Sequence, residues 1–352
     1  MGEFGLRLKR HYSIVAHSPD LVELRHGVWN PESYTFRDDA GSGRLFRIMK
    51  RLDGTAAPSQ IAREEGVPLE DVEGLIDHLQ TLGVLESSAT TALDHYIDTL
   101  VPWRSDGARS TQTVLQLGDA EPTTAIADYL RASLPDVEMR VLGADDPVRR
   151  LITSLSGPEL LDGLAFEEAL EVADGWRDSF VIHASSVIDP VELRIVNRIC
   201  LGLAVPWLHA ALDGPFVLVG PLVVPQRSPC YECLETRVTM NMRERASYQQ
   251  YKEALAELAV APGGMPAHPI MVGMLASHAS LEALNFLATG STFTINKLLA
   301  IYLPTMEVAY NEVLRVPSCP ACSPTPEQQE TSLYFDTGAL LVEPTGRSAA
   351  DG

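Results

Sequence analysis

The most informative stretch of this chain for its fold is Pro229-Cys230-Tyr231-Glu232-Cys233-Leu234. A second stretch with the same cysteine spacing, Ser318-Cys319-Pro320-Ala321-Cys322, follows later in the chain. Each stretch holds a Cys-x-x-Cys pair, whose short turn lets two sulfur atoms approach one ion at about 2.3 Å. Two such pairs complete a tetrahedron. The sequence therefore predicts a zinc site made by Cys230, Cys233, Cys319 and Cys322. A closed four-sulfur site has no open position, which makes the zinc structural. Two disulfides are the alternative interpretation.

Composition bounds the class of protein. The chain has 352 residues, of which 45% are hydrophobic and 21% charged, and its formal net charge is −20. These values predict a globular protein of two or three domains. We expect no nucleic-acid binding, because a nucleic-acid binder needs basic side chains to replace counterions.

Location follows from the thiols and from the apolar segments. Reduced thiols that bind metal are typical of the cytoplasm, and no apolar segment of a secretory signal follows the basic residues Arg7, Lys9 and Arg10. The most apolar stretch, Ile270–Ala288, carries His278 and Glu282. It is predicted to be a buried helix, and no membrane span is expected.

Strands and helices alternate between Thr113 and the first cysteine pair, which predicts a doubly wound α/β domain. The expected strands are 114–118, 137–142, 180–184, 205–210 and 216–224, and the expected helices are 123–133 and 190–203. A longer charged helix is expected over 235–258.

The first strand of this domain runs into Gly118-Asp119-Ala120-Glu121-Pro122-Thr123. A nucleotide-binding fold needs G-x-G-x-x-G here, so that the backbone can approach the phosphates at a helix N-terminus. One glycine of that pattern is present. The two acidic residues repel phosphate, and Pro122 has no N–H. The sequence predicts a nucleotide-type fold without ATP.

The N-terminal region is predicted to be a small winged helix-turn-helix. Short strands are expected over 12–16, 21–25 and 33–37, and helices over 45–52, 59–65 and 68–82. The third helix has no Lys or Arg between Pro68 and Leu85, so DNA binding is not expected.

Peptide capture is the alternative use of such a domain. An edge strand offers free backbone N–H and C=O groups to an extended peptide, and a neighbouring helix receives its side chains. Core packing is the competing interpretation for Tyr34 and Phe36. The candidate peptide-binding residues are Tyr34, Thr35, Phe36 and Arg37 on the strand and Leu75, Ile76 and Leu79 on the helix.

Other polar residues in apolar surroundings are predicted to be structural. Cys200 lies in an apolar helix, where an inert buried thiol is expected. The histidines His183, His209, His268 and His278 lack the i, i+4 partner of a helical metal pair.

The strand–helix pattern, the two cysteine pairs and the apolar helix near 270–288 resemble the ThiF/MoeB family over about residues 110–325. Residues 5–88 look like the PqqD-like recognition element (RRE) of ribosomal-peptide (RiPP) biosynthesis. The combination resembles the ThiF-like partner proteins of azoline-forming cyclodehydratases. These belong to thiazole/oxazole-modified microcin and thiopeptide pathways, whose products include bacteriocins.

That resemblance implies a function. The chain would be a non-catalytic accessory protein that binds the leader of a precursor peptide and presents its core to a separate YcaO-type cyclodehydratase. A homodimer is a further implication. The rival interpretation is a ThiF/MoeB-type adenylating enzyme acting on a C-terminal carboxylate. The expected domains are a PqqD-like element at 1–88, a linker at 89–112, a degenerate ThiF-like domain with structural zinc at 113–325 and a mobile tail at 326–352.

Overall fold

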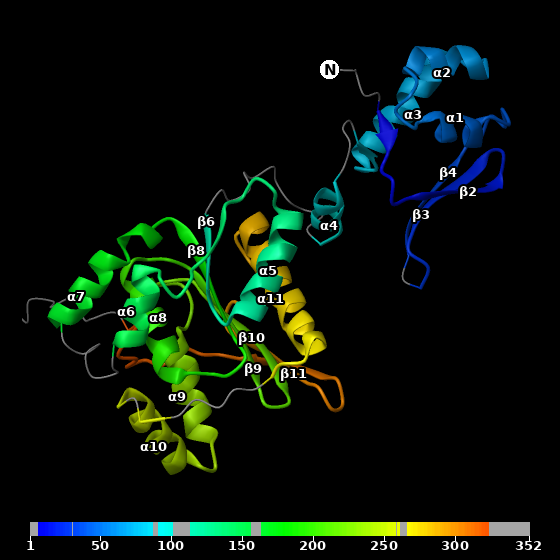
Figure 1. The fold of residues 1–352 in the computed structure, drawn as a ribbon. Helices are drawn as coiled ribbons and strands as arrows, with labels where there is room; N and C mark the ends of the chain where they lie inside the picture. The colour runs from blue at the N-terminus through cyan, green and yellow to red at the C-terminus, as the bar shows by residue number, and fades with distance from the viewer. Residues whose placement is uncertain are drawn as a thin grey trace, which may run out of the picture. The chain divides into compact units, whose positions relative to one another are not determined.

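The structure, a computed structural model, describes residues 6–29, 31–86, 91–100, 113–155, 163–257, 259–260 and 266–323. The chain divides into two compact units, which we call unit 1 (residues 1–106) and unit 2 (residues 107–352) (Figure 1). The predicted tail at 326–352 lies outside the described residues, as do 89–90 and 101–112 of the predicted linker.

Unit 1 has the predicted order of three strands and three helices. A three-stranded antiparallel sheet has the order β2-β3-β4, and a short pair β1-β5 lies apart from it. The elements are β1 Arg7–Leu8, β2 Ser13–Ser18, β3 Leu21–His26, β4 Glu32–Arg37, α1 Leu45–Arg51, α2 Pro58–Glu65, α3 Leu69–Thr81, β5 Leu85–Glu86 and α4 Ala92–Leu100. Helix α4 falls inside the segment predicted to be a linker.

The core of unit 1 forms where one face of the sheet meets the helices. Val22 and Leu24 of β3 are fully buried, and Ile61, Val72 and Leu79 pack with them from α2 and α3. Gly66 ends α2 in the left-handed conformation at φ 65°, which glycine adopts without a Cβ penalty. The helical periodicity of the sequence therefore located the helices and their inner face.

Unit 2 is built on a seven-stranded mixed sheet with the order β12-β11-β10-β9-β8-β6-β7. Strands β7, β6, β8 and β9 run parallel, and β10, β11 and β12 add antiparallel. The strands are β6 Thr113–Gly118, β7 Met139–Val141, β8 Ser179–Ser185, β9 Trp207–Asp213, β10 Phe216–Val223, β11 Lys297–Tyr302 and β12 Glu307–Glu312.

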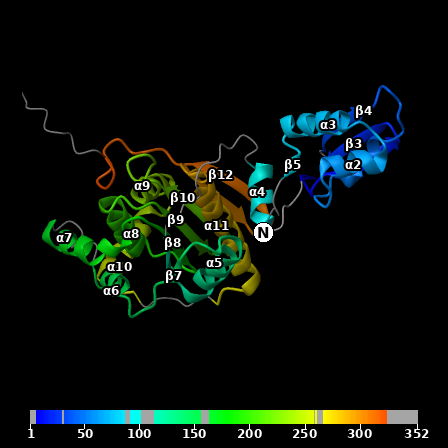
Figure 2. The same cartoon turned by 90° about the horizontal axis from the view of Figure 1, so that it is seen from above.

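Helices cover both faces of this sheet, with α5 and α11 on one face and α6 to α9 on the other (Figures 1 and 2). The helices are α5 Ala120–Ser133, α6 Pro147–Ser154, α7 Gly163–Val172, α8 Pro190–Gly202, α9 Tyr231–Asn241, α10 Arg245–Ala256 and α11 Pro269–Thr289. The doubly wound α/β class is thus confirmed. The charged helix expected over 235–258 is two helices, α9 and α10, separated at Met242.

Helix α11 is the one described helix that is long and apolar enough, by length and composition, to cross a membrane. Half of its apolar window, 50%, is buried inside the fold. Leu275, Ala279 and Ala283 have no exposed surface, and the helix contacts α5, β9 and β10. Its apolar residues are therefore used in the core, as predicted.

Candidate functional site

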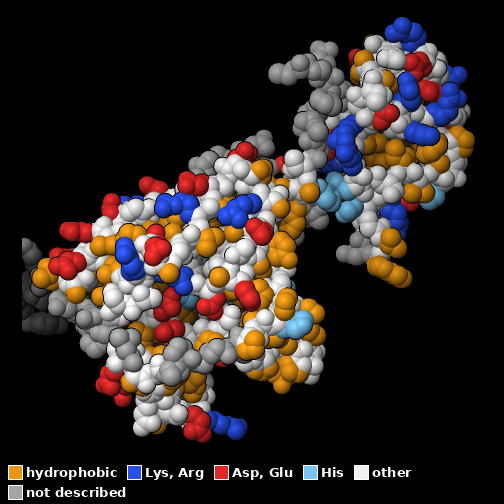
Figure 3. Space-filling model, viewed as in Figure 1, with side chains coloured by type: hydrophobic (Ala, Val, Ile, Leu, Met, Phe, Trp, Pro, Cys, Tyr) orange, Lys and Arg blue, Asp and Glu red, His pale blue; other side chains and the backbone are white. Residues whose placement is uncertain are grey.

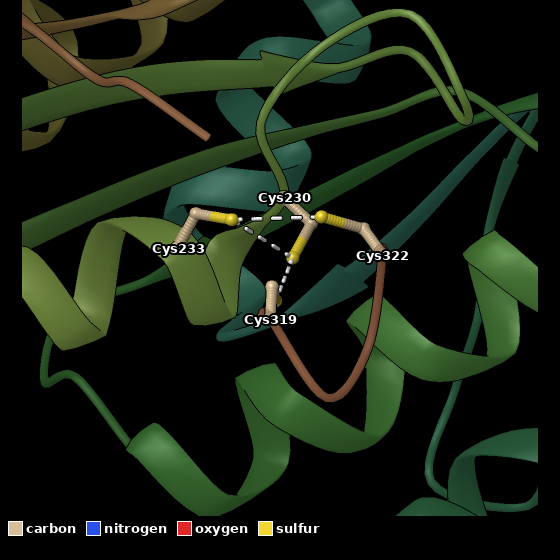
Figure 4. A group of neighbouring side chains, drawn as sticks. All are labelled: Cys230, Cys233, Cys319 and Cys322. Atoms are coloured by element: carbon tan, nitrogen blue, oxygen red, sulfur yellow. Dashed lines mark hydrogen bonds between the residues drawn. The ribbon is translucent and has the colours of Figure 1, made fainter. Parts of the chain in front are cut away.

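The four predicted zinc ligands come together in unit 2 (Figure 4). Their sulfur atoms all lie within 4.8 Å of one another, and no other group of three or more described His, Cys, Asp or Glu side chains meets that test. Three of the four cysteines are buried. The two halves of the sequence pattern therefore make one cluster that could hold a metal ion.

The sulfur–sulfur distances match a tetrahedral metal site. They are 4.0 Å for Cys230–Cys233, 3.6 Å for Cys230–Cys319 and 3.5 Å for Cys233–Cys322. Four sulfurs placed at about 2.3 Å from one zinc ion would lie about 3.8 Å apart. All five cysteines are free thiols in this structure, so the disulfide interpretation does not describe it.

The first pair is positioned by the start of α9. Cys230 is the N-cap residue, and its carbonyl accepts the Cys233 N–H at 3.1 Å. The helix N-terminus favours negative charge, which suits a thiolate ligand. The Val316 N–H also points at the Cys233 sulfur, at 3.3 Å. Hydrogen bonds from the Cys230 and Cys319 thiols and from this N–H hold the pKa of the Cys233 thiol below its usual value.

An ion pair between Arg198 and Glu232 holds the segment of Cys230 and Cys233 against α8. Arg198 donates to both oxygens of Glu232, at 2.8 and 3.1 Å, and Glu232 is only 2% exposed. The second pair is tied to the first by Arg315, which donates to the Ser228 carbonyl at 2.9 Å. Buried partners of this kind orient metal ligands. The protein itself therefore holds both cysteine pairs in position, independently of a bound ion.

The loop between β6 and α5 lies at the place where a nucleotide fold would hold phosphate. Asp119 is the N-cap residue of α5, and its carboxylate accepts the Ser186 N–H at 2.6 Å. Glu121 and Pro122 occupy the first turn. The helix N-terminus thus carries acidic side chains and lacks one N–H donor, which is unfavourable for phosphate.

Gly118 permits this loop to pass close to β8. Its φ is +119°, and a Cβ there would lie 1.9 Å from the Ala184 carbonyl oxygen. We expect Gly118→Ala to lower the free energy of unfolding by more than about 3 kcal/mol, because backbone atoms of β8 would have to move. Chemical denaturation of the two proteins measures the loss. The matched control is Gly143→Ala, where a Cβ would meet nothing within 4 Å. Equal stability of both variants would contradict the argument.

A pocket of about 460 Å³ opens where β8 and β9 end, which is the usual position of ligand sites in α/β sheets. No pattern in the sequence indicated this pocket. It is lined by Ser186, Val187, Ile188, Pro190, His209, Leu212, Asp213, Gly214, Leu218, Tyr231, Leu234, Glu235, Val238, Met242, Tyr248, Tyr251 and Leu298. Most of these side chains are apolar or aromatic.

Glu235 joins three helices beside the pocket. Its carboxylate accepts hydrogen bonds from Arg194 of α8 at 2.8 Å, Lys252 of α10 at 2.7 Å and the Tyr248 hydroxyl at 3.0 Å. Glu235 is 5% exposed, so the paired carboxylate stays buried. This network explains why α10, which has no buried residue, remains attached to the domain.

His209 lies on β9 and lines the pocket. Its Nδ1 donates to the Gly220 carbonyl at 2.9 Å, and Nε2 is buried without a partner. Burial lowers its pKa from 6.5 to about 4. Below about pH 6.5 the His209 imidazole is therefore protonated in the unfolded chain but stays neutral in the folded protein.

Unit 2 is consequently expected to lose about 2 kcal/mol of stability at this residue between pH 7.5 and 5. His209→Gln keeps a donor for Gly220 but does not titrate, so its stability should fall less over the same interval. Denaturation curves at the two pH values measure the difference. His278→Gln on α11 is the control. An unchanged pH dependence in His209→Gln would refute the assignment.

Cys200 and His183 are both buried in the core of unit 2. Cys200 has no exposed surface, and burial raises the pKa of its thiol. His183 is 1% exposed, and its Nε2 lies 3.1 Å from Glu192. Neither residue belongs to the metal cluster.

The predicted peptide-binding strand, β4, is an edge of the sheet in unit 1. The Asp38 N–H donates to the Asp20 carbonyl at 2.9 Å, which starts the alternation of bonded pairs along β3 and β4. Phe36 and Tyr34 therefore bond to β3 through their backbones. Ser33, Thr35 and Arg37 direct their backbone N–H and C=O groups to the open edge.

Side-chain burial differs among the predicted peptide-binding residues. Phe36 is 7% exposed, Ile76 is 5% and Leu79 is 0%, and all three belong to the core of unit 1. Phe36 therefore packs in the core, and its part in peptide binding stays a prediction. Tyr34 and Leu75 are half-buried, and Thr35 and Arg37 are exposed. The Phe36 and His78 rings lie 5.9 Å apart, so α3 flanks β4.

No protein-family model matches this chain. No curated protein matches it either. Solved structures do. A heterocyclase in complex with substrate and cofactor has a TM-score of 0.64 and 16% identity, covering 90% of this chain and 39% of that one. The heterocyclase TruD has a TM-score of 0.62 and 19% identity, covering 91% and 43%. This chain thus spans about two fifths of the heterocyclases' length.

The microcin C7 biosynthetic enzyme MccB, in complex with N-formylated MccA, is similar over nearly its whole length. Its TM-score is 0.53 at 15% identity, covering 90% of this chain and 99% of that one. E. coli MccB with AMPCPP and MccA gives 0.51 at 16%. At these identities the likeness shows the fold. The chain therefore shares the fold of these structures, and the predicted α/β fold class is confirmed.

Proposed function

We propose that this chain is a non-catalytic scaffold that binds the leader of a ribosomal precursor peptide through unit 1. It presents the peptide core to a separate YcaO-type cyclodehydratase, which forms the azoline rings. The scaffold acts by raising the concentration of the core at the partner's active site.

The open edge of β4 carries this proposal. Its outward backbone groups at Ser33, Thr35 and Arg37 can pair with an extended peptide, as strands do when they add to an exposed sheet edge. Helix α3 flanks the strand, and Leu75 on this helix is half-buried. This is the arrangement expected of a PqqD-like recognition element.

One further observation supports a scaffold over an enzyme. The acidic N-terminus of α5, with Asp119 and Glu121, is unfavourable for ATP phosphates. Within this proposal the cysteine cluster holds structural zinc, and the protein acts in the cytoplasm, as a monomer or as the expected homodimer.

Fluorescence anisotropy tests the proposal directly. The probe is a labelled leader peptide from a precursor encoded beside the gene, and ATP is titrated separately into the same protein. Saturable leader binding at micromolar concentration without ATP binding supports the scaffold. Absence of leader binding at that concentration overturns it.

A ThiF/MoeB-type adenylating enzyme, acting on a C-terminal carboxylate, is the second candidate. The likeness to MccB over 99% of its length favours it. ATP binding without leader binding in the same titrations would place this function first.

A further inference from the structure

Three histidines from separate segments of unit 1 lie together. His11 precedes β2, His26 ends β3 and His95 belongs to α4. The ring centroids are 4.7 Å apart for His11–His26, 4.8 Å for His11–His95 and 5.9 Å for His26–His95. All three are half-buried, and Figure 3 shows histidine side chains gathered on the surface of this unit. We call this group the histidine cluster.

The spacing of the rings is that of a metal site. Imidazoles that bind one tetrahedral ion through nitrogens at about 2.0–2.1 Å place their ring centres about 5 Å apart. The three observed distances lie on both sides of that value. Among the described residues only the four cysteines already bring their ligand atoms within 4.8 Å, so the rings must turn to direct one nitrogen each at an ion. The χ2 torsion of histidine has broad energy minima, so the rings can turn at little cost.

Hydrogen bonding already prepares His26 as a ligand. Its Nδ1 lies 3.1 Å from the His11 carbonyl oxygen, to which it donates, leaving Nε2 for a metal. A ligand histidine usually donates its other ring N–H in this way.

A carboxylate adjoins the cluster. Glu32 accepts hydrogen bonds from the Tyr12 hydroxyl at 3.0 Å and from the Tyr34 hydroxyl at 2.8 Å, both through Oε1. The Tyr12 ring lies 4.4 Å from that of His11, so Glu32 is held beside the histidines. Its Oε2 makes neither of these two bonds and is suited to be a fourth ligand.

We propose that His11, His26 and His95 bind one divalent transition-metal ion, with zinc as the expected occupant and Glu32 beside it. Nitrogen ligands suit Zn²⁺, Ni²⁺ and Cu²⁺, and thiolates are absent from this site. The ion joins α4 to the sheet of unit 1. This site is separate from the cysteine cluster, and the inference does not rest on the proposed function.

Elemental analysis of the tag-free full chain, dialysed after loading with zinc, tests the proposal. Wild type should retain two zinc ions per chain. His95→Gln and His26→Gln should retain one and bind the second at least about 100-fold more weakly. His78→Gln is the matched control in the same unit and should retain two. Circular dichroism checks that each variant is folded.

Cobalt distinguishes the two sites. Co²⁺ at the four cysteines gives thiolate charge-transfer bands, and Co²⁺ at the histidine cluster gives none. A second equivalent of cobalt should bind to wild type without increasing these bands, and His95→Gln should not take it up. Wild type that binds a single ion, or a folded His95→Gln that keeps the second, overturns the proposal. The number of ions bound per wild-type chain tests the proposal by itself, so a variant that fails to fold does not obscure the outcome.

Discussion

Replacing Cys233 by serine is expected to release the metal from unit 2 and to lower its free energy of unfolding by about 5 kcal/mol or more. Structural zinc contributes on the order of 10 kcal/mol in small metal-dependent domains, and part of that is retained where the rest of the fold is large. Cys233 contacts two other thiols and the Val316 N–H. Its loss therefore opens the tetrahedron and leaves the remaining thiols without an ion.

The effect should be large because the cluster joins distant segments. Cys230 and Cys233 belong to the start of α9, whereas Cys319 and Cys322 follow β12. Without the ion, the segment after β12 keeps the buried Val313 and the Arg315 and Arg237 hydrogen bonds to backbone carbonyls. Hydrogen bonds donated by a charged group contribute about 1.5–3 kcal/mol each, which is less than a structural zinc ion contributes.

Metal content and thermal unfolding measure this prediction together. Cys200→Ala is the control, because Cys200 is buried in the same core but is not a member of the cluster. It should lose stability from the missing sulfur and keep the metal. A strong chelator added to wild type should reproduce the serine variant. Unchanged unfolding after complete removal of the metal would show that the ion is not structural.

Local patterns predicted the parts of this molecule that depend on nearby residues. The Cys-x-x-Cys spacing located all four members of the cluster, and apolar strands identified β6, β8, β9 and β10. The hairpin of β11 and β12 was missed. Every residue of β12 is exposed, so this strand lacks the alternation of buried and exposed side chains that identifies strands.

Features that depend on tertiary arrangement were not accessible to the sequence. His11, His26 and His95 share no spacing in the chain, and only the packing of α4 on the sheet brings their rings together. The pocket likewise needs the carboxyl ends of β8 and β9 to meet α9 and α10.

The peptide-binding set shows the same limit at the level of side-chain direction. Alternation places Tyr34 and Phe36 on one face of β4 and Thr35 and Arg37 on the other, but it does not say which face is inside. The core showed that the first face packs inward. The hypothesis of peptide binding therefore now depends on the backbone of β4. It can be tested by removing a single backbone N–H group.

Thr35→Pro is expected to weaken leader binding at least 30-fold, about 2 kcal/mol, with the fold of unit 1 intact. Proline removes the Thr35 N–H, which points to the open edge and is not part of a bonded pair with β3. An added peptide would leave a carbonyl unpaired there and would meet the proline ring. Proline is tolerated on edge strands where the N–H faces outward, so the sheet itself should form.

Thr35→Val is the matched control, because it keeps the N–H and the β-branched shape and changes only the hydroxyl. Anisotropy with the labelled leader compares both variants with wild type, and chemical denaturation verifies their stability. Peptide addition to β4 predicts a loss confined to the proline variant. If both variants lose affinity equally, the peptide contacts the Thr35 side chain and not the strand's backbone. If a folded Thr35→Pro binds as tightly as Thr35→Val, the leader does not add to this edge, and the mechanism proposed for unit 1 is wrong.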